Sequence, residues 1–273
     1  MPNRPQWTLT ETARFWSYWA KRPVLHQEYF SYQVGRSVAV VAERIGVLRG
    51  TVLDYGCGPG FLLDHLLDRD LALHGFEFSE TYAEVVARRT AGRHGWQGLR
   101  TAATLPTPFA DGQFDLVFCL ETLEHLIDDL VTPVLQELYR LCRPGGSVFI
   151  TTPHRESLAE NFIYCPFCDS EFHKIQHQRS FTADSMRDLL TAHGFTVNYC
   201  APVTLRRFQD AESLFPLRTI RPWRLRLWAG YRALRVLDML TGAGRGYASR
   251  TFQYLAQPGN NLLAIAQRPP ETR

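Results

Sequence analysis

Three glycines that follow a short apolar strand form the most informative pattern in the chain. The strand ends in Asp54, and the glycines alternate with other residues before a helical pattern begins: Gly56, Gly58 and Gly60. Glycine adopts positive φ at little cost and lets a ligand approach the backbone closely. The pattern therefore predicts a ligand at the carboxyl end of this strand. A tight turn without a ligand is the alternative.

A second acid supports the ligand interpretation. Glu77 stands 23 residues after Asp54, at the end of the next apolar segment. An acid at this place can accept hydrogen bonds from both hydroxyls of a ribose. A nicotinamide oxidoreductase would use the same geometry, but the glycine spacing differs from the G-x-G-x-x-G pattern of dinucleotide sites.

Cysteine and histidine are concentrated in one later segment. The spacing C-x2-C-x4-H-x3-H is formed by Cys165, Cys168, His173 and His177. Two thiolates and two imidazoles suit tetrahedral zinc, and a site with four protein ligands leaves no position for a substrate. The spacing predicts one structural Zn²⁺. The alternative is a pair of reduced thiols, with the histidines in a substrate pocket.

Alternating apolar strands and helices surround these residues. Two helices are expected within residues 10–46. The expected strands are 51–55, 71–78, 114–119, 147–152, 195–200 and 261–266, and the expected helices between them are 61–67, 80–90, 128–142 and 182–192. Buried strands that alternate with helices indicate an α/β fold, with a mostly parallel sheet covered on both faces.

The organisation of the chain follows from these patterns. A helical N-terminal cap is expected over residues 1–46, and the core over residues 47–200 plus 258–268. The core contains the Cys/His loop, residues 154–181. Residues 201–257 form a long detour, which is typical of a functional loop or helical insert.

Composition limits the class of protein. The 273 residues are 45% hydrophobic and 21% charged, with a formal net charge of +3, which is ordinary for a globular domain and excludes whole-chain disorder. No apolar run reaches the roughly 20 residues that span a bilayer. The first residues contain no apolar signal region, and the six cysteines are scattered. These features predict a cytoplasmic protein.

Positive charge is concentrated in the detour. Residues 205–250 hold ten arginines and three acids. An Arg-rich helix suits a lid over a phosphate-bearing or carboxylate-bearing acceptor, or peripheral contact with an anionic membrane. A packed helix with a solvated basic face is the third interpretation. No DNA partner is expected, because the rest of the chain is mildly acidic and contains no recognisable nucleic-acid module.

Four segments, taken in order, carry a resemblance to a known family: residues 54–60, 108–117, 121–126 and 141–150. Together they resemble the class I S-adenosylmethionine-dependent methyltransferases, in particular the small-molecule, ubiquinone-biosynthesis-like members. The resemblance implies a Rossmann-like, doubly wound sheet of seven strands in the order 3-2-1-4-5-7-6. It also implies that the last strand is antiparallel.

The resemblance also implies a set of cofactor-binding residues. The methionine part of S-adenosylmethionine would be bordered by Asp54 and by the glycine loop, which consists of Gly56, Cys57, Gly58 and Gly60. Glu77 would hold the ribose. The adenine would contact Phe78 and Leu105, and the methionine pocket would be lined by Leu120 and Glu121. Arg36, in the helix before the first strand, is a candidate partner for the methionine carboxylate.

The expected reaction is methyl transfer to a small molecule, with a hydroxyl oxygen as the favoured acceptor and nitrogen or carbon as alternatives. Such transfer needs in-line positioning, and a base if the acceptor is a hydroxyl. The candidate bases are His125 and His154, and Glu124 is the weaker candidate because it is expected to face solvent. The other functions considered are a non-catalytic cofactor-binding scaffold and an RNA or protein methyltransferase.

Overall fold

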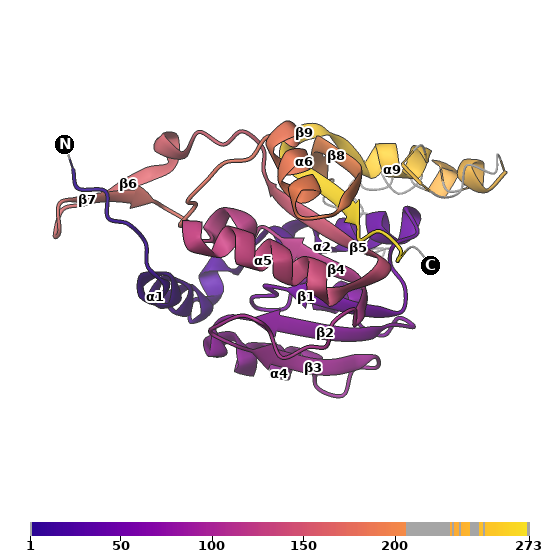
Figure 1. The fold of residues 1–273 in the computed structure, drawn as a ribbon, viewed down its shortest axis with the longest axis horizontal. Helices are drawn as coiled ribbons and strands as arrows, with labels where there is room; N and C mark the ends of the chain where they lie inside the picture. Colours follow the sequence, from indigo (N-terminus) through magenta and orange to yellow (C-terminus); the bar gives the residue numbers. More distant parts are fainter. Residues whose placement is uncertain are drawn as a thin grey trace, which may run out of the picture.

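A seven-stranded sheet forms the centre of the protein in the computed structural model, which describes residues 2–205, 230, 232–234, 236–240, 246–247 and 249–271 (Figure 1). The strand order is β3-β2-β1-β4-β5-β9-β8. The strands are β1 (Thr51–Tyr55), β2 (Ala72–Glu77), β3 (Trp96–Thr101), β4 (Phe114–Leu120), β5 (Cys142–Pro153), β8 (Thr196–Leu205) and β9 (Ala256–Gln267).

The predicted topology is confirmed. Strands β3, β2, β1, β4 and β5 pair in parallel, and β9 pairs antiparallel with both β5 and β8. The order equals 3-2-1-4-5-7-6 once β6 and β7, which form a separate hairpin, are left out of the count. The carboxyl ends of β1, β2, β4 and β5 therefore lie along one edge of the sheet.

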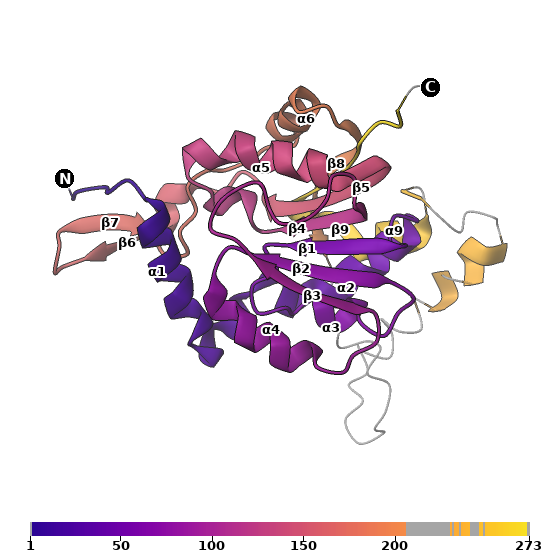
Figure 2. The same cartoon turned by 60° about the horizontal axis from the view of Figure 1, so that its bottom comes forward.

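Helices cover both faces of the sheet (Figure 2). They are α1 (Leu9–Ala20), α2 (Phe30–Arg44), α3 (Leu63–Leu66), α4 (Ala83–Thr90), α5 (Asp128–Leu141), α6 (Ala183–Ala192) and α9 (Arg250–Leu255), with short 3-10 turns η1 (Pro23–Glu28), η2 (Glu80–Tyr82), η3 (Leu123–His125) and η4 (Leu158–Asn161). Helix α2 packs on one face, and α5 and α6 pack on the other.

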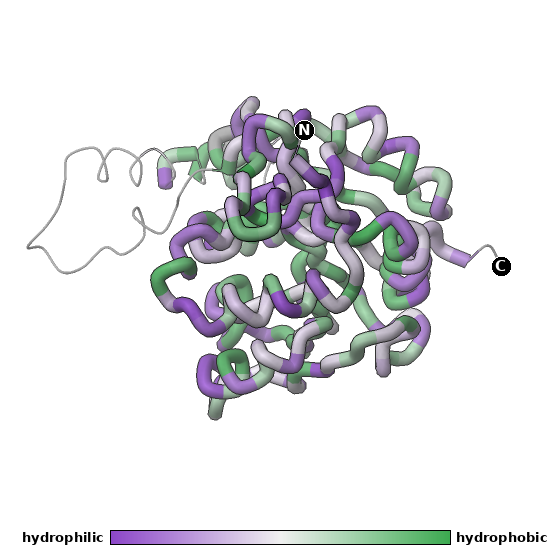
Figure 3. Tube along the Cα trace, turned by 90° about the vertical axis from the view of Figure 1, so that its left-hand side faces the viewer, coloured by the Kyte–Doolittle hydropathy of each residue, from purple (hydrophilic) through white to green (hydrophobic). Residues whose placement is uncertain are grey.

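Successive residues of a strand point to opposite faces, which explains the two apolar layers. In β1, Val52 belongs to the layer beneath α2, and Leu53 belongs to the layer beneath α5. Each strand or helix contributes apolar residues to one of these layers and polar residues elsewhere. Hydrophobic and hydrophilic stretches therefore alternate along the described part of the chain (Figure 3).

Three strands, β5, β8 and β9, extend further than the sequence indicates. Leu205 at the end of β8 pairs with Ala256 at the start of β9, so the sheet continues into the segment expected to form the insert. Most of residues 206–248, including most of the Arg-rich segment, lie outside the described residues. Among the helices that are described, none is both long enough and apolar enough to cross a bilayer.

A separate hairpin extends from the body beside the N-terminus (Figure 1). It consists of β6 (Phe162–Cys165) and β7 (Ser170–His173). The N-terminal segment joins its edge, because the backbone N–H of Asn3 donates to the carbonyl of Asp169 over 2.8 Å. Arg4 forms a 2.8 Å ion pair with Glu171.

Candidate functional site

The glycine loop at the end of β1 has the backbone that its sequence predicts. Gly56, Gly58 and Gly60 have φ values of +76°, +50° and +78°. The backbone N–H groups of Gly56 and Cys57 both donate to the carbonyl of Phe76, over 2.9 and 3.0 Å. A Cβ added to Gly56 would lie 2.8 Å from the hydroxyl of Thr122. Glycine is therefore required at position 56 for both conformation and space.

Two buried acids face this loop. Glu77 accepts hydrogen bonds from the backbone N–H of Gly58 (2.9 Å) and of Ser79 (3.1 Å). Burial, together with the charge of Glu77, raises the pKa of Asp54 to about 8, and burial raises the pKa of Glu77. Both acids lie at the carboxyl edge of the sheet, as the sequence indicates.

The other residues proposed for the cofactor lie around the same edge or in the helix beside it. Phe78 packs edge-on against Phe76, with ring centroids 4.9 Å apart, and Leu105 packs against the apolar layer beneath α5. Leu120 ends β4 and is followed by Glu121. Arg36 lies in α2, in the turn where Gly35 approaches the ring of His65.

Tyr29 is a residue of this region that the sequence analysis missed. A Cβ on Gly58 would lie 3.6 Å from its ring. Its hydroxyl is 2.8 Å from that of Tyr82, and its ring contacts those of Trp19 and Phe61. The run of aromatic residues before β1 was the available signal, but aromatic spacing alone does not separate a core from a ligand site.

A cluster of ionisable side chains lies where β4 ends. Glu121 has φ +45°, a strained value for a residue other than glycine, and such strain is concentrated at functional sites. Glu124 lies in η3 and is completely buried, so the expectation that it faces solvent was wrong. Among the described residues, both carboxylate oxygens of Glu124 lack a hydrogen-bond partner.

The electrostatics of this cluster favour neutral groups. Burial and the charge of Glu121 raise the pKa of Glu124, and burial raises the pKa of Glu121 to about 7. Burial and the neighbouring His177 lower the pKa of His125 to about 3. A buried carboxylate without a partner is costly, and a bound cation would offset that cost.

The Cys/His loop brings a second set of residues to the cluster. Glu156 follows β5, and its carboxylate accepts hydrogen bonds from His173 Nε2 (3.2 Å) and from His177 Nδ1. The His173 and His177 rings stack with centroids 4.5 Å apart and an interplanar angle of 13°. Burial acts to raise the pKa of Glu156, but the two histidines outweigh it and lower this pKa to about 2.

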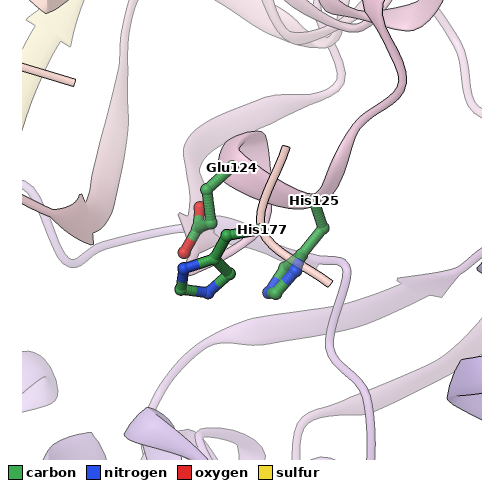
Figure 4. A group of neighbouring side chains, drawn as sticks. All are labelled: Glu124, His125 and His177. Atoms are coloured by element: carbon green, nitrogen blue, oxygen red, sulfur yellow. The ribbon is translucent and has the colours of Figure 1, made fainter. Parts of the chain in front are cut away.

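Within the described part of the chain, two groups of potential metal ligands share His177. In each group, Glu124–His125–His177 and Glu156–His173–His177, the ligand atoms lie within 4.8 Å of one another. The Glu156 carboxylate is already occupied by two imidazoles. The first group keeps an unpartnered carboxylate, with the two rings beside it (Figure 4), and is the better candidate for a cation. Ions with bonds of about 2.1 Å hold their ligand atoms within about 4 Å of one another, so small side-chain movements would complete this site.

The structure does not bring the four predicted zinc ligands together, because the hairpin separates Cys165 from His173. Cys165 pairs with Ser170, whereas His173 pairs with Phe162. These pairs are three residues apart along the strands, which corresponds to about 10 Å. The histidines instead bind Glu156, and Cys168 is exposed in the turn of the hairpin.

Helix α1 covers the cluster formed by Glu124, His125 and His177, which is called the cation cluster below. Trp16 packs edge-on against His125, with ring centroids 4.7 Å apart, and its indole N–H donates to the side-chain oxygen of Gln176 over 2.8 Å. The side-chain N–H of Gln176, which is fully buried, donates to the carbonyl of His125 over 2.8 Å.

His154, the second candidate base, lies just after β5. Its backbone N–H donates to the carbonyl of Asn260 over 2.7 Å, and the residue bridges to Phe181. His154 belongs to neither ligand group found among the described residues.

Comparison with curated proteins identifies relatives of the core. The chain is 34% identical to the ubiquinone biosynthesis O-methyltransferase of Pseudomonas paraeruginosa over 125 residues, which are 45% of this chain and 52% of that protein. The enzyme of the same name from Pseudomonas fluorescens is 33% identical over 124 residues, with the same coverage of 45% and 52%. The chain spans about half the length of these curated relatives.

Solved structures share the fold across nearly the whole chain. The 1,6-didemethyltoxoflavin-N1-methyltransferase of Burkholderia thailandensis superposes with a TM-score of 0.54 at 17% identity, covering 98% of this chain and 94% of that one. The cyclase SpnF superposes with a TM-score of 0.59 at 17% identity, covering 99% of both chains. At this identity the likeness concerns the fold alone, and the two proteins are named for different reactions.

Family membership rests on the sequence match and the architecture together. The family described as "Methyltransferase domain" matches residues 13–199, which include the glycine loop, Glu77 and the end of β4. The observed sheet order, with β9 antiparallel, agrees with this match. The chain belongs to the class I S-adenosylmethionine-dependent methyltransferases.

Proposed function

We propose that the protein transfers the methyl group of S-adenosylmethionine to a hydroxyl oxygen of a small molecule, and that a divalent cation held by Glu124, His125 and His177 binds that hydroxyl. The observation that carries this proposal is the buried, unpartnered carboxylate of Glu124 beside two imidazoles. The cluster lies at the end of β4, on the same sheet edge as the glycine loop.

The residues at the end of β1 fit the methyl donor. The backbone of Gly56, Gly58 and Gly60 leaves room for the methionine part, and Glu77 offers two carboxylate oxygens to a ribose. Those oxygens now accept backbone N–H groups, so we expect the ribose hydroxyls to compete for the same acceptors. The bound sulfonium supplies an activated methyl group.

The remaining cofactor assignments belong to the same proposal. Phe78 and Leu105 would contact the adenine, and Arg36 would pair with the methionine carboxylate. Leu120, Glu121 and Asp54 would line the methionine pocket, and Cys57 would border it through its backbone. Their support is their position around one sheet edge and in α2.

The cation site also suits the chemistry of a hydroxyl acceptor. A divalent cation held by these residues would lower the pKa of a bound hydroxyl, in the way that zinc lowers the pKa of bound water. His125, with a pKa near 3, accepts a proton poorly but is a good neutral ligand. We therefore assign His125 to the cation and leave His154 as the remaining candidate base. The curated relatives carry the name O-methyltransferase, which supports oxygen as the acceptor.

The proposal is tested by calorimetry followed by a transfer assay. We expect S-adenosylmethionine and S-adenosylhomocysteine to bind the purified protein, and Mn²⁺ to bind in a separate titration. Radiolabelled methyl transfer to a small-molecule metabolite extract should be lost after chelation and should return with Mn²⁺. Transfer that is indifferent to chelation would contradict the cation part of the proposal. Nucleoside binding without transfer to any metabolite would favour a scaffold, and transfer only to RNA or protein would favour a macromolecular acceptor.

An anionic or lipid-linked acceptor remains a prediction from the Arg-rich segment, as does peripheral contact with an anionic membrane. Flotation with liposomes of neutral and of anionic composition tests the membrane contact. Binding to the anionic vesicles alone is the expected result.

A further inference from the structure

One half-buried carboxylate, that of Glu156, is shared by two stacked imidazoles at the rim of the proposed cation site. Glu156 Oε1 bonds His173 Nε2 and Glu156 Oε2 bonds His177 Nδ1. An ionised carboxylate only accepts hydrogen bonds, so each ring must place a proton on the nitrogen that faces it. The two rings are therefore not free to choose their tautomers.

The tautomer of His173 is fixed a second time, by the backbone. Its Nδ1 accepts the backbone N–H of His177 over 3.1 Å and lies 3.4 Å from the backbone nitrogen of Ile175. A nitrogen that accepts a backbone N–H carries no proton of its own, so His173 has its proton on Nε2. His177 has no such backbone constraint at its Nδ1 and depends on Glu156.

We propose that Glu156 is a positioning residue, which holds His177 in the tautomer with the proton on Nδ1 and so leaves the Nε2 lone pair as the one that can bind a cation. This inference rests on the proposed cation site and adds the group that prepares one of its ligands. Histidine ligands of metals are commonly oriented in this way by a carboxylate on the other ring nitrogen. Stacking on His173 restricts rotation of the His177 ring.

The arrangement makes a specific prediction for Glu156→Gln. A glutamine has one accepting oxygen and one donating nitrogen. Because the backbone fixes His173 as a donor, the glutamine oxygen must face His173 and its amide nitrogen must face His177. His177 then accepts at Nδ1 and carries its proton on Nε2, which removes the lone pair from the nitrogen that would bind the cation.

A double variant separates this effect from general damage. In Glu156→Gln combined with His173→Phe, an aromatic ring is kept at position 173, but its donor to residue 156 and its acceptor for the backbone N–H of His177 are both lost. The glutamine oxygen is then released and can turn to His177. We expect His177 to return to its original tautomer, so the second substitution repairs the first.

The experiment uses the metal-free protein with ¹⁵N-labelled histidine, and long-range ¹H–¹⁵N correlation spectra report the tautomer of each ring. We expect His177 to be protonated on Nδ1 in the wild type, on Nε2 in Glu156→Gln and on Nδ1 again in the double variant. Glu160→Gln, at an exposed position four residues away, is the matched control and should match the wild type. Circular dichroism verifies that each variant is folded.

Mn²⁺ titration of the same samples gives the second measurement. We expect Glu156→Gln to weaken binding by about 10–100-fold, and the double variant to recover part of this loss. An unchanged His177 tautomer in Glu156→Gln would overturn the inference. If Glu156→Gln does not fold, the wild type alone still tests the inference. Finding its His177 protonated on Nε2 would overturn the inference. If the tautomers change as expected but no sample binds a cation, the positioning role stands and the proposed cation site is the part that fails.

Discussion

The glycine loop and the cation cluster meet at one sheet edge but are built in opposite ways. The loop is made of backbone, and its functional residues lie between Asp54 and Glu77. The cluster is made of side chains, and Glu124 and His177 are 53 residues apart. The loop depends on local conformation, so residue types reveal it. The cluster depends on how a long loop returns to the sheet, so only the fold reveals it.

The largest expected effect tests whether the loop depends on space as well as on conformation. Gly56→Ala should reduce S-adenosylhomocysteine binding below detection, because the new Cβ would meet Thr122 at 2.8 Å. Gly92→Ala is the control, since Gly92 has φ +68° and open space around it. Both variants should lose about 1–2 kcal/mol of stability from strain. Equal calorimetric affinities in the two variants would show that the close approach is unimportant.

Glu124→Gln tests the cluster independently of the loop. Loss of a residue that only supports a metal ligand lowers metal affinity by about 10–100-fold. We expect Glu124→Gln to lower Mn²⁺ affinity by more than this, because a ligand itself is lost. Binding of S-adenosylhomocysteine should be unchanged, since Glu124 does not belong to the glycine loop. In the metal-free protein the free energy of unfolding should rise at neutral pH, because the raised pKa of Glu124 makes the wild type take up a proton on folding, which glutamine does not require.

Asp129→Asn, at an exposed position in α5, is the control for this substitution and should leave both ligands unaffected. A loss of nucleoside affinity in Glu124→Gln equal to the loss of Mn²⁺ affinity would mean that the two sites are one unit.

The pH dependence of stability sharpens the comparison further, because both sites contain acids with raised pKa values. The pKa is about 8 for Asp54 and about 7 for Glu121. A raised pKa in the folded state gives stability that is complete below the unfolded value near 4 and is lost as pH rises through the folded value.

Urea unfolding of the ligand-free protein should therefore show lower stability at pH 8.5 than at pH 5.5, by about 2 kcal/mol or more. Mn²⁺ should reduce this difference by pairing the cluster acids. A flat profile between the two pH values would contradict the assigned burial.

The smallest expected effect concerns the hairpin. Replacing Cys165 and Cys168 together by serine should change Mn²⁺ affinity by less than about two-fold, because distant sites act independently. The Cys pair is separated from the histidines along β6 and β7. A large loss of Mn²⁺ affinity would indicate that the thiols do bind the metal, and that the hairpin and the cluster form one site.

Sequence patterns predicted the glycine loop and Glu77, because each is expressed over a short stretch of chain. The sheet order followed from the family resemblance, and β3 was missing from the strands that the patterns indicated. The patterns placed His173 and His177 in one zinc site with Cys165 and Cys168, whereas the structure places both rings against Glu156. Spacing cannot show that β6 and β7 place Cys165 next to Ser170 and leave Glu156 beside the rings. Glu124 was expected to face solvent, because an isolated acid usually does.

The first residues of the chain have a consequence for anyone who modifies them. Asn3 and Arg4 attach the N-terminus to the hairpin, and α1 runs from there to the ring of His125. A purification tag fused before Met1, or removal of the first few residues, would disturb this attachment. The position of α1, which covers the cluster, would then be less firmly held. We expect such changes to weaken catalysis at a site that the tag itself never touches.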